Sequence, residues 1–289
     1  EPGGGGINVA RAAAKLGGHP RAIAALGGMT GAQVAALLDG TGVSLARFKV
    51  VGETRQNLAV TDRGTSGQYR LQMPGPIWTP AMESAMAETV EAEAMAIGPG
   101  TVVVLSGSQP PGMDDGFPQT LARRLGPRAR LIVDTSGPAL ERLVRTPDAD
   151  ARPLVLRMDQ QESEGLAGHP LDDLRASADF AQSLVARGVA DCVVVARGAE
   201  GSVLATRALR LHARPPVVPV ASKIGAGDSF AAAFALSLAA TAPGAEDWGA
   251  ALTAGTAAAA AAVMTPGSEL CRAEDAAAIA PRCTLSPCD

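Results

Sequence analysis

The feature that most constrains the fold is an alternation of short apolar runs with helical segments over most of the chain. Four short runs rich in apolar residues have the composition of buried strands, at residues 101–105, 130–133, 154–156 and 191–195. Helical patterns lie between or beside them, at residues 81–95, 118–125 and 176–187. Strands that are buried on both faces and separated by helices indicate a parallel sheet covered on both sides. Polar loops after the strand ends are where such folds place their sites.

The first residues continue this pattern on a smaller scale. A run of glycines at residues 3–6 precedes a helical pattern that stops at Gly17. Residues 21–26 form a short apolar strand pattern, and residues 31–38 read as another helix ending before Gly40.

Residues 48–73 depart from the alternation. Polar and apolar side chains alternate between residues 54 and 61, with Arg55 and Asn57 on one face. After a Gly-containing turn, a second alternating run places Arg70 on its polar face, together with glutamines 68 and 72. Period-two patterning around such a turn predicts an antiparallel hairpin. We therefore divide the chain into an α/β core, residues 1–47 and 76–289, and a β-hairpin region, residues 48–75.

The most informative motif for chemistry is Gly225-Ala226-Gly227-Asp228, which opens an Ala-rich helix. The glycines allow backbone N–H groups to converge at the helix N-terminus, where the helix dipole also favours an anion. Asp228 at the edge of this loop can accept a proton from an attacking hydroxyl. These are the two requirements of phosphoryl transfer, charge stabilisation and a positioned nucleophile. The alternative is that Asp228 caps the helix and the glycines only form a turn.

Composition argues against several other functions. The formal net charge of -4 and the pI near 5.5 are atypical of a nucleic-acid or acidic-lipid surface. We expect no signal peptide and no membrane span, because the required apolar stretches are lacking. The four cysteines form no Cys-x-x-Cys pair and have no His at ligand spacing, which argues against zinc and a disulfide framework. We expect a cytoplasmic protein that binds small molecules.

Five motifs, in a fixed order over essentially the whole chain, resemble the PfkB-type, ribokinase-like carbohydrate kinases. They are GGGGINVAR at residues 3–11, TRQN at 54–57, SGSQPPG at 106–112, DTSG at 134–137 and GAGDS at 225–229. The branch most similar contains phosphofructokinase-2, tagatose-6-phosphate kinase and 1-phosphofructokinase. The resemblance implies a three-layer α/β/α sandwich with a small β-sheet lid. It also implies ATP as phosphoryl donor, magnesium, often potassium, and a homodimer joined through the lids.

The resemblance further implies roles for individual positions. Asp228 matches the catalytic base, and the anion hole is matched by Gly225, Ala226 and Gly227. The positions matching sugar contacts are Gly5, Gly6, Asn8 and Ser108. The positions matching the nucleotide site are Asp159, Gly198 and Gly201, and Glu162 matches an acidic residue that supports magnesium through water.

Two arginines of the hairpin bear on the substrate class. Arg55 and Arg70 lie on the polar faces of neighbouring predicted strands, so that they can converge over one pocket. A phosphate on the acceptor sugar favours such bidentate recognition. The alternative is two ordinary surface arginines. We expect a phosphosugar acceptor, fructose 6-phosphate first, with tagatose 6-phosphate or fructose 1-phosphate as alternatives.

Three features depart from the family pattern. Members usually open with a strand that carries a sugar-binding Asp, and this sequence begins after it. The usual Lys-Pro-Asn is here Arg157-Met158-Asp159, which replaces a neutral amide near the metal with a carboxylate. The usual Ser-Leu-Gly at the nucleotide is here Ala-Arg-Gly at residues 196–198. These changes leave open a catalytically silent member that only binds sugar or nucleotide, although the presence of Asp228 argues against it.

Overall fold

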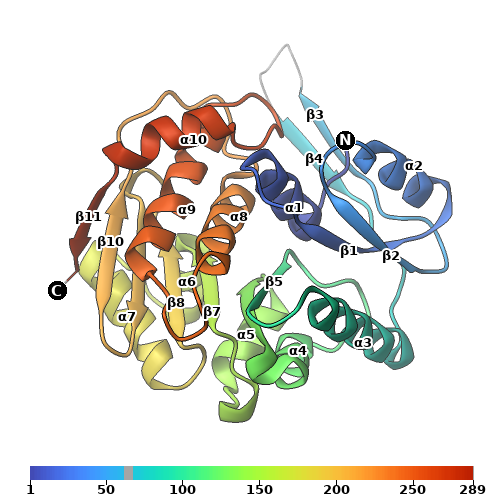
Figure 1. The fold of residues 1–289 in the computed structure, drawn as a ribbon, viewed down its shortest axis with the longest axis horizontal. Helices are drawn as coiled ribbons and strands as arrows, with labels where there is room; N and C mark the ends of the chain where they lie inside the picture. Colours follow the sequence, from blue (N-terminus) through green and yellow to red (C-terminus); the bar gives the residue numbers. More distant parts are fainter. Residues whose placement is uncertain (62–67, 289) are drawn as a thin grey trace.

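A computed structural model describes residues 1–61 and 68–288 of the chain (Figure 1). The turn expected at residues 62–67 lies outside the described residues. So do the side chains of residues 59–61, 68, 70 and 72, whose backbone belongs to the hairpin. Among the described helices, none is long and apolar enough to cross a membrane.

A seven-stranded sheet forms the centre of the molecule, in the order β11-β10-β9-β8-β7-β6-β5. Its parallel half contains the four predicted strands, β5 (Thr101–Ser106), β6 (Ala129–Asp134), β7 (Val155–Asp159) and β8 (Cys192–Ala196). Its antiparallel half contains β9 (Ser202–Thr206), β10 (Arg210–Arg214) and β11 (Thr284–Pro287). The expectation of a wholly parallel sheet is therefore wrong for this half. The links from β8 to β9 and from β9 to β10 are too short for a crossover, so these strands must turn back antiparallel.

Helices cover both faces of the sheet, which confirms the three-layer sandwich (Figure 1). One layer contains α3 (Pro80–Ile97), α4 (Phe117–Leu125), α5 (Pro138–Arg145) and α7 (Leu174–Ala186). The other contains α1 (Gly5–Lys15), α8 (Ala226–Ala239), α9 (Trp248–Val263) and α10 (Ala273–Ile279). The short helix α6 (Gln160–Ala167) follows β7 directly.

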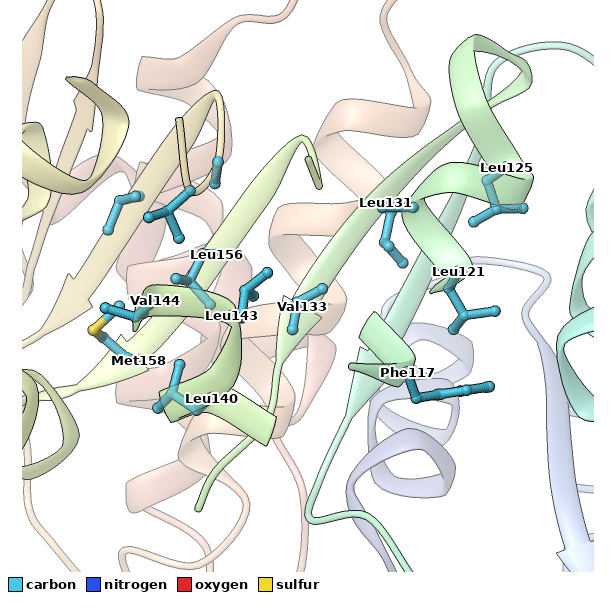
Figure 2. Packing of buried hydrophobic residues seen from close by; sticks show 14 of the residues in the cluster. Phe117, Leu121, Leu125, Leu131, Val133, Leu140, Leu143, Val144, Leu156 and Met158 are labelled. Atoms are coloured by element: carbon cyan, nitrogen blue, oxygen red, sulfur yellow. The ribbon is translucent and has the colours of Figure 1, made fainter. Parts of the chain in front are cut away.

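The core of the first layer is built from aliphatic side chains that alternate along the strands (Figure 2). Leu131 and Val133 of β6 face α4 and α5, whereas Ile132 between them packs against the opposite layer. The α4 side chain Leu121 and the α5 side chain Leu143 are almost completely buried here. Burying a leucine of this kind contributes roughly 1.5–3 kcal/mol. The sheet is thus held from both sides, and only its strand ends and edges reach solvent.

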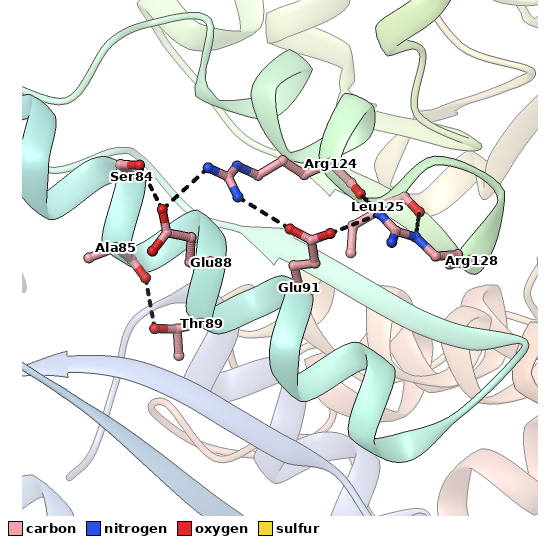
Figure 3. Close-up of polar contacts among 8 residues, drawn as sticks. All are labelled: Ser84, Ala85, Glu88, Thr89, Glu91, Arg124, Leu125 and Arg128. Carbon is pink, nitrogen blue, oxygen red and sulfur yellow. Dashed lines mark hydrogen bonds and ion pairs between the residues drawn. The ribbon is translucent and has the colours of Figure 1, made fainter.

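Ion pairs join the outer surfaces of α3 and α4 (Figure 3). Glu91 of α3 pairs with Arg124 at 3.2 Å and with Arg128 at 2.8 Å, and Arg124 also reaches Glu88 at 3.5 Å. Exposed pairs of this kind contribute only about 0.2–1 kcal/mol each. The apolar layer beneath them therefore accounts for most of the helix packing.

Two small sheets lie beside the central one. In the first, β1 (Arg21–Leu26) pairs in parallel with β2 (Ser44–Lys49), and α2 (Gly28–Leu38) connects them. In the second, β3 (Asn57–Thr61) and β4 (Gln68–Gln72) form the predicted antiparallel hairpin. The hairpin begins at Asn57 rather than at residue 54, so Arg55 precedes the strand. Strand β2 was not expected and runs across residue 48; the division into core and hairpin region stays a prediction.

Candidate functional site

The polar residues of the motifs meet at the carboxyl ends of the parallel strands. Ser106, the last residue of β5, is paired in register with Asp134, the last residue of β6. In the pairing of β7 with β8, Asp159 at the end of β7 is opposite Ala196 at the end of β8. Parallel pairing places all of these ends at one edge, where open α/β sheets bind their ligands.

Two cavities adjoin at this edge. The smaller, of about 210 Å³, is lined by polar side chains that include Asp134, Arg157, Asp159, Glu162 and Asp228. The larger, of about 990 Å³, extends between β1 and β5 and is lined by the glycine run of residues 3–6, by Asn8 and by residues 105–111. Ser106 and Gly107 line both cavities. The two cavities are therefore neighbouring parts of one site.

Asp228 lies where the two cavities meet. Its Oδ2 accepts a hydrogen bond of 2.9 Å from Nδ2 of Asn8, a residue of the larger cavity, while Asp228 itself lines the smaller one. Burial raises the pKa of Asp228 above its ordinary value, and the negative charge of Asp134 adds to this. The hydrogen bond from Asn8 and the charge of Arg157 act in the opposite direction. The carboxyl group is thus a stronger base than an exposed aspartate.

Helix α8 directs its N-terminus at the same place. Gly225 occupies the N-cap position in the left-handed conformation, with φ of 79°, and a Cβ there would meet Leu270 at 2.8 Å. Among the described residues, no side chain caps this helix. Its first N–H groups are unpaired within the helix and can bind an anion. Asp228 is in the first turn and not at the N-cap, so the capping alternative does not describe it.

Asp159 and Glu162 are joined in a capping box at the start of α6. The Asp159 side chain accepts from the backbone N–H of Glu162 at 2.8 Å, and Glu162 accepts from the N–H of Asp159 at 2.9 Å. Burial raises the pKa of Glu162, and the charges of Asp159 and Asp134 raise it further, whereas the hydrogen bond from the Asp159 N–H and the charge of Arg157 act to lower it. Each carboxylate keeps an oxygen that takes no part in the capping box.

The carboxylates of the smaller cavity suit magnesium better than a metal held by protein alone. Among the described residues, no three or more Asp, Glu, His or Cys side chains converge as a ligand set. Magnesium usually binds one or two carboxylates and keeps water and substrate phosphate as its other ligands. Asp134, Asp159 and Glu162 line one polar cavity and supply donors of this kind.

The residues expected to contact the sugar gather around the larger cavity. Gly5, Gly6, Asn8, Ser108 and Arg55 all line it. A Cβ on Gly5 would lie 2.5 Å from Oγ of Ser106, so this glycine permits the close approach of α1 to β5, whereas Gly6 faces open space. The Arg70 side chain lies outside the described residues; its backbone pairs with Ala59 in the hairpin.

The two glycines expected beside a nucleotide are in the turn from β8 to β9. Neither Gly198 nor Gly201 is among the described residues that line the two cavities. Gly201 has φ of 96°, and a Cβ there would lie 2.0 Å from the carbonyl oxygen of Ala213. The turn itself therefore requires this glycine, and the nucleotide role of both stays a prediction.

Sequence reasoning assigned no role to two charged residues of the smaller cavity. Asp134 was recognised only as part of a motif and Arg157 only as a departure from one, yet they form an ion pair of 3.0 Å inside the cavity. The available signal was position, because both lie at the carboxyl ends of predicted strands.

Comparisons with known proteins agree with this geometry. The family model described as pfkB family carbohydrate kinase matches residues 1–275. The ATP-dependent 6-phosphofructokinase isozyme 2 of Escherichia coli is 36% identical over 279 residues, covering 95% of this chain and 85% of the relative. The 1-phosphofructokinase of Xanthomonas campestris is 34% identical over 240 residues, covering 82% and 74%. The crystal structure of E. coli phosphofructokinase-2 in complex with potassium superimposes with a TM-score of 0.86 at 34% identity, covering 98% and 88%.

The contact between Asn8 and Asp228 gives a direct test of the electrostatics. Because the amide hydrogen bond lowers the pKa of Asp228, Asn8→Ala should raise this pKa further. The measurement is an NMR titration of the Asp228 carboxyl carbon. The control Asn57→Ala, which also lines the larger cavity, should leave the titration unchanged. A curve that does not move in Asn8→Ala would contradict the geometry.

Proposed function

The chain belongs to the pfkB family of carbohydrate kinases, and on this basis we propose that it transfers the γ-phosphoryl group of ATP to a sugar phosphate. The first candidate acceptor is fructose 6-phosphate, giving fructose 1,6-bisphosphate, a step of glycolysis. The observation that carries the proposal is the position of Asp228 between the two cavities, at the N-terminus of α8. Fructose 1-phosphate is a second candidate, because a 1-phosphofructokinase is also a relative. Tagatose 6-phosphate is a third acceptor of the same class.

The proposed division of labour follows the two cavities. The acceptor sugar lies in the larger cavity, with one hydroxyl near Asp228 and Asn8. Asp228 takes the hydroxyl proton, the oxygen forms a bond to the γ-phosphorus, and ADP leaves with the electrons of the broken P–O bond. The N–H groups of Ala226 and Gly227 face the charge that develops on the phosphoryl oxygens. Anchoring of Asp228 by Asn8 keeps the carboxylate directed at the acceptor.

The proposal includes metal ions. Magnesium, when bound, would supply charge neutralisation for the phosphates, and Asp159 and Glu162 are the residues that would hold it with water and phosphate. Potassium is included because a structure of the E. coli relative contains it, and no residues are assigned to it. The reactants, ATP and a phosphosugar, are cytoplasmic metabolites, and a cytoplasmic location is part of the proposal.

The proposal also includes a homodimer that forms through the hairpin. The hairpin carries exposed apolar side chains on one face, Leu58, Leu71 and Tyr69, which we call the lid face. Their exposed fractions of 56%, 57% and 62% are high for residues of this kind on a small sheet. A second copy of the chain would cover this apolar surface.

The catalytic role of Asp228 predicts a large effect of Asp228→Asn. The amide keeps the size but cannot accept a proton, so turnover should fall by about 10²–10⁴-fold. The measurement is ADP release over a panel of free and phosphorylated sugars, with the exposed Asp39→Asn as control. Because only ionised Asp228 accepts the proton and its pKa is raised, kcat/KM of the wild type should fall with acid at a pH above the ordinary aspartate range. Turnover of Asp228→Asn within a few-fold of the wild type would remove the base role.

The substrate class is tested at Arg55, which lines the larger cavity. If Arg55 binds the acceptor's phosphate, Arg55→Ala should lower the ratio of kcat/KM for phosphosugar over free sugar ten- to hundred-fold, about 1.5–3 kcal/mol. Lysine should rescue only in part, since it lacks the planar fork. Arg70→Ala should behave in the same way. The control Arg47→Ala removes an exposed arginine of β2 that does not line the cavity. An unchanged ratio in both variants would favour an unphosphorylated acceptor.

The metal assignment is tested at Asp159. Asparagine is as good an N-cap as aspartate, so Asp159→Asn should preserve the melting temperature while it removes a charge near the metal. Magnesium should then bind more weakly with ATP, or the magnesium optimum of activity should shift. Calorimetry of ATP binding at several magnesium concentrations measures the first effect. Superimposable magnesium titrations of the two proteins would show that Asp159 only caps the helix.

The dimer is tested on the lid face. Tyr69→Glu should convert a dimer to a monomer, because it places a charge in the proposed interface. Sedimentation velocity measures the oligomeric state, and Met95→Glu, on the exposed surface of α3, is the control. A monomeric wild type, or a Tyr69→Glu variant that remains dimeric, would contradict this interface.

A further inference from the structure

Arg157 is the one positively charged side chain among the described residues that line the smaller cavity. It extends from β7 toward the N-terminus of α8, and 14% of its side chain is exposed. The same cavity is lined by the carboxylates of Asp134, Asp159, Glu162 and Asp228. Such a concentration of negative charge repels a phosphate unless cations compensate for it. Arg157 is therefore placed where a phosphoryl group requires positive charge.

The guanidinium is held in one position by three neighbours. Its Nη1 donates a hydrogen bond of 3.0 Å to Oδ1 of Asp134. Its Cζ lies 5.8 Å from the centre of the Phe230 ring, one turn into α8. A Cβ built on Gly227 would lie 2.9 Å from Nη1 and 3.2 Å from Nη2. A side chain at residue 227 would collide with the guanidinium, so this glycine allows Arg157 to approach the anion-binding turn.

The same guanidinium has unused donors. Within the described part of the chain, the buried Nε has no hydrogen-bond partner, and Nη2 donates to no acceptor. Burial acts to lower the pKa of Arg157, but the charge and hydrogen bond of Asp134 and the charges of Glu162 and Asp159 together raise it above its ordinary value. Arg157 is thus a permanent cation with free N–H groups beside the N-terminus of α8. A buried donor without an acceptor is unfavourable, which points to an acceptor supplied by a ligand.

On the basis of the proposed phosphoryl transfer, we propose that Arg157 binds the moving phosphoryl group and stabilises its charge together with the N–H groups of α8. The bond from the γ-phosphorus to ADP breaks, the bond to the sugar oxygen forms, and the sugar proton goes to Asp228. Arg157 neither gains nor loses a proton. Asp134 is a positioning residue, because its carboxylate orients the guanidinium. The planar fork of arginine matches phosphoryl oxygens in a way that lysine does not.

The test compares Arg157→Met and Arg157→Lys with a matched control, Arg130→Met. Arg130 is also a buried arginine of the central sheet; it lies 3.7 Å from Glu246 and does not line either cavity. Three kinds of measurement are made on each protein: steady-state kinetics giving kcat and KM for the accepted sugar, the melting temperature, and calorimetric affinity for MgADP with and without fluoroaluminate. MgADP with fluoroaluminate mimics the phosphoryl group during transfer.

If Arg157 acts on the moving group, Arg157→Met should lower kcat by at least about 10²-fold, with a much smaller change in KM. It should lose the gain in affinity that fluoroaluminate gives to MgADP, while the affinity for MgADP alone changes only a few-fold. Arg157→Lys should be intermediate in both measurements. Arg130→Met should lower the melting temperature and keep its kcat and its fluoroaluminate effect.

A kcat of Arg157→Met within a few-fold of the wild type would overturn the inference. A fluoroaluminate effect of wild-type size in Arg157→Met would also overturn it, because an arginine with only a structural role would change the melting temperature and not this affinity. If Arg157→Met does not fold, the test rests on Arg157→Lys. A kcat and a fluoroaluminate effect of wild-type size in Arg157→Lys would show that the reaction does not require the guanidinium. A wild type that releases no ADP with any sugar would instead overturn the proposed function, and this inference with it.

Discussion

Burial of the parallel strands on both faces is the constraint on which the rest of the structure depends. Strands β5 to β8 are covered by apolar side chains from two helical layers, so a polar group in their middle would lack a partner. The polar residues Ser106, Asp134 and Asp159 lie at the carboxyl ends of these strands, and Arg157, inside β7, is paired with Asp134. The connections between these strands all begin at that edge. The site is therefore a consequence of how the sheet is covered.

Concentrating charge at this edge has an electrostatic consequence. Burial raises the pKa of Asp228 and of Glu162, and neighbouring carboxylates add to this, Asp134 in both cases and Asp159 for Glu162. The structure relieves part of this repulsion with Arg157, and part by using Asp159 and Glu162 as acceptors for backbone N–H groups at the start of α6. The remaining negative charge suits a divalent cation. A cavity lined by carboxylates can therefore bind phosphate once Arg157 and a divalent cation compensate for the negative charge.

The sequence predicted the parallel half of the sheet because its strands are apolar runs bounded by turn residues, which is a local signal. It did not predict β2, β9, β10 or β11, which become strands through their pairing with other strands of the fold. In the site, Asp228 was recognisable from its adjacent glycines. Arg157 was not, because its importance depends on Asp134 and Gly227, which lie far from it in the sequence.

Several glycines show the same distinction between a local sequence motif and a contact made by a distant residue. The positive φ of Gly225 at the start of α8 accords with a local motif that the sequence displays. The requirement for glycine at residues 5, 201 and 227 comes instead from Ser106, Ala213 and Arg157, which approach from other elements. The sequence by itself determined the layered α/β fold and the family, since local periodicity and ordered motifs carry both. Only the tertiary structure decided that Asp228 pairs with Asn8 and that Arg157 lies against Gly227. Such contacts depend on the packing of elements far apart in the chain, and no local pattern encodes them.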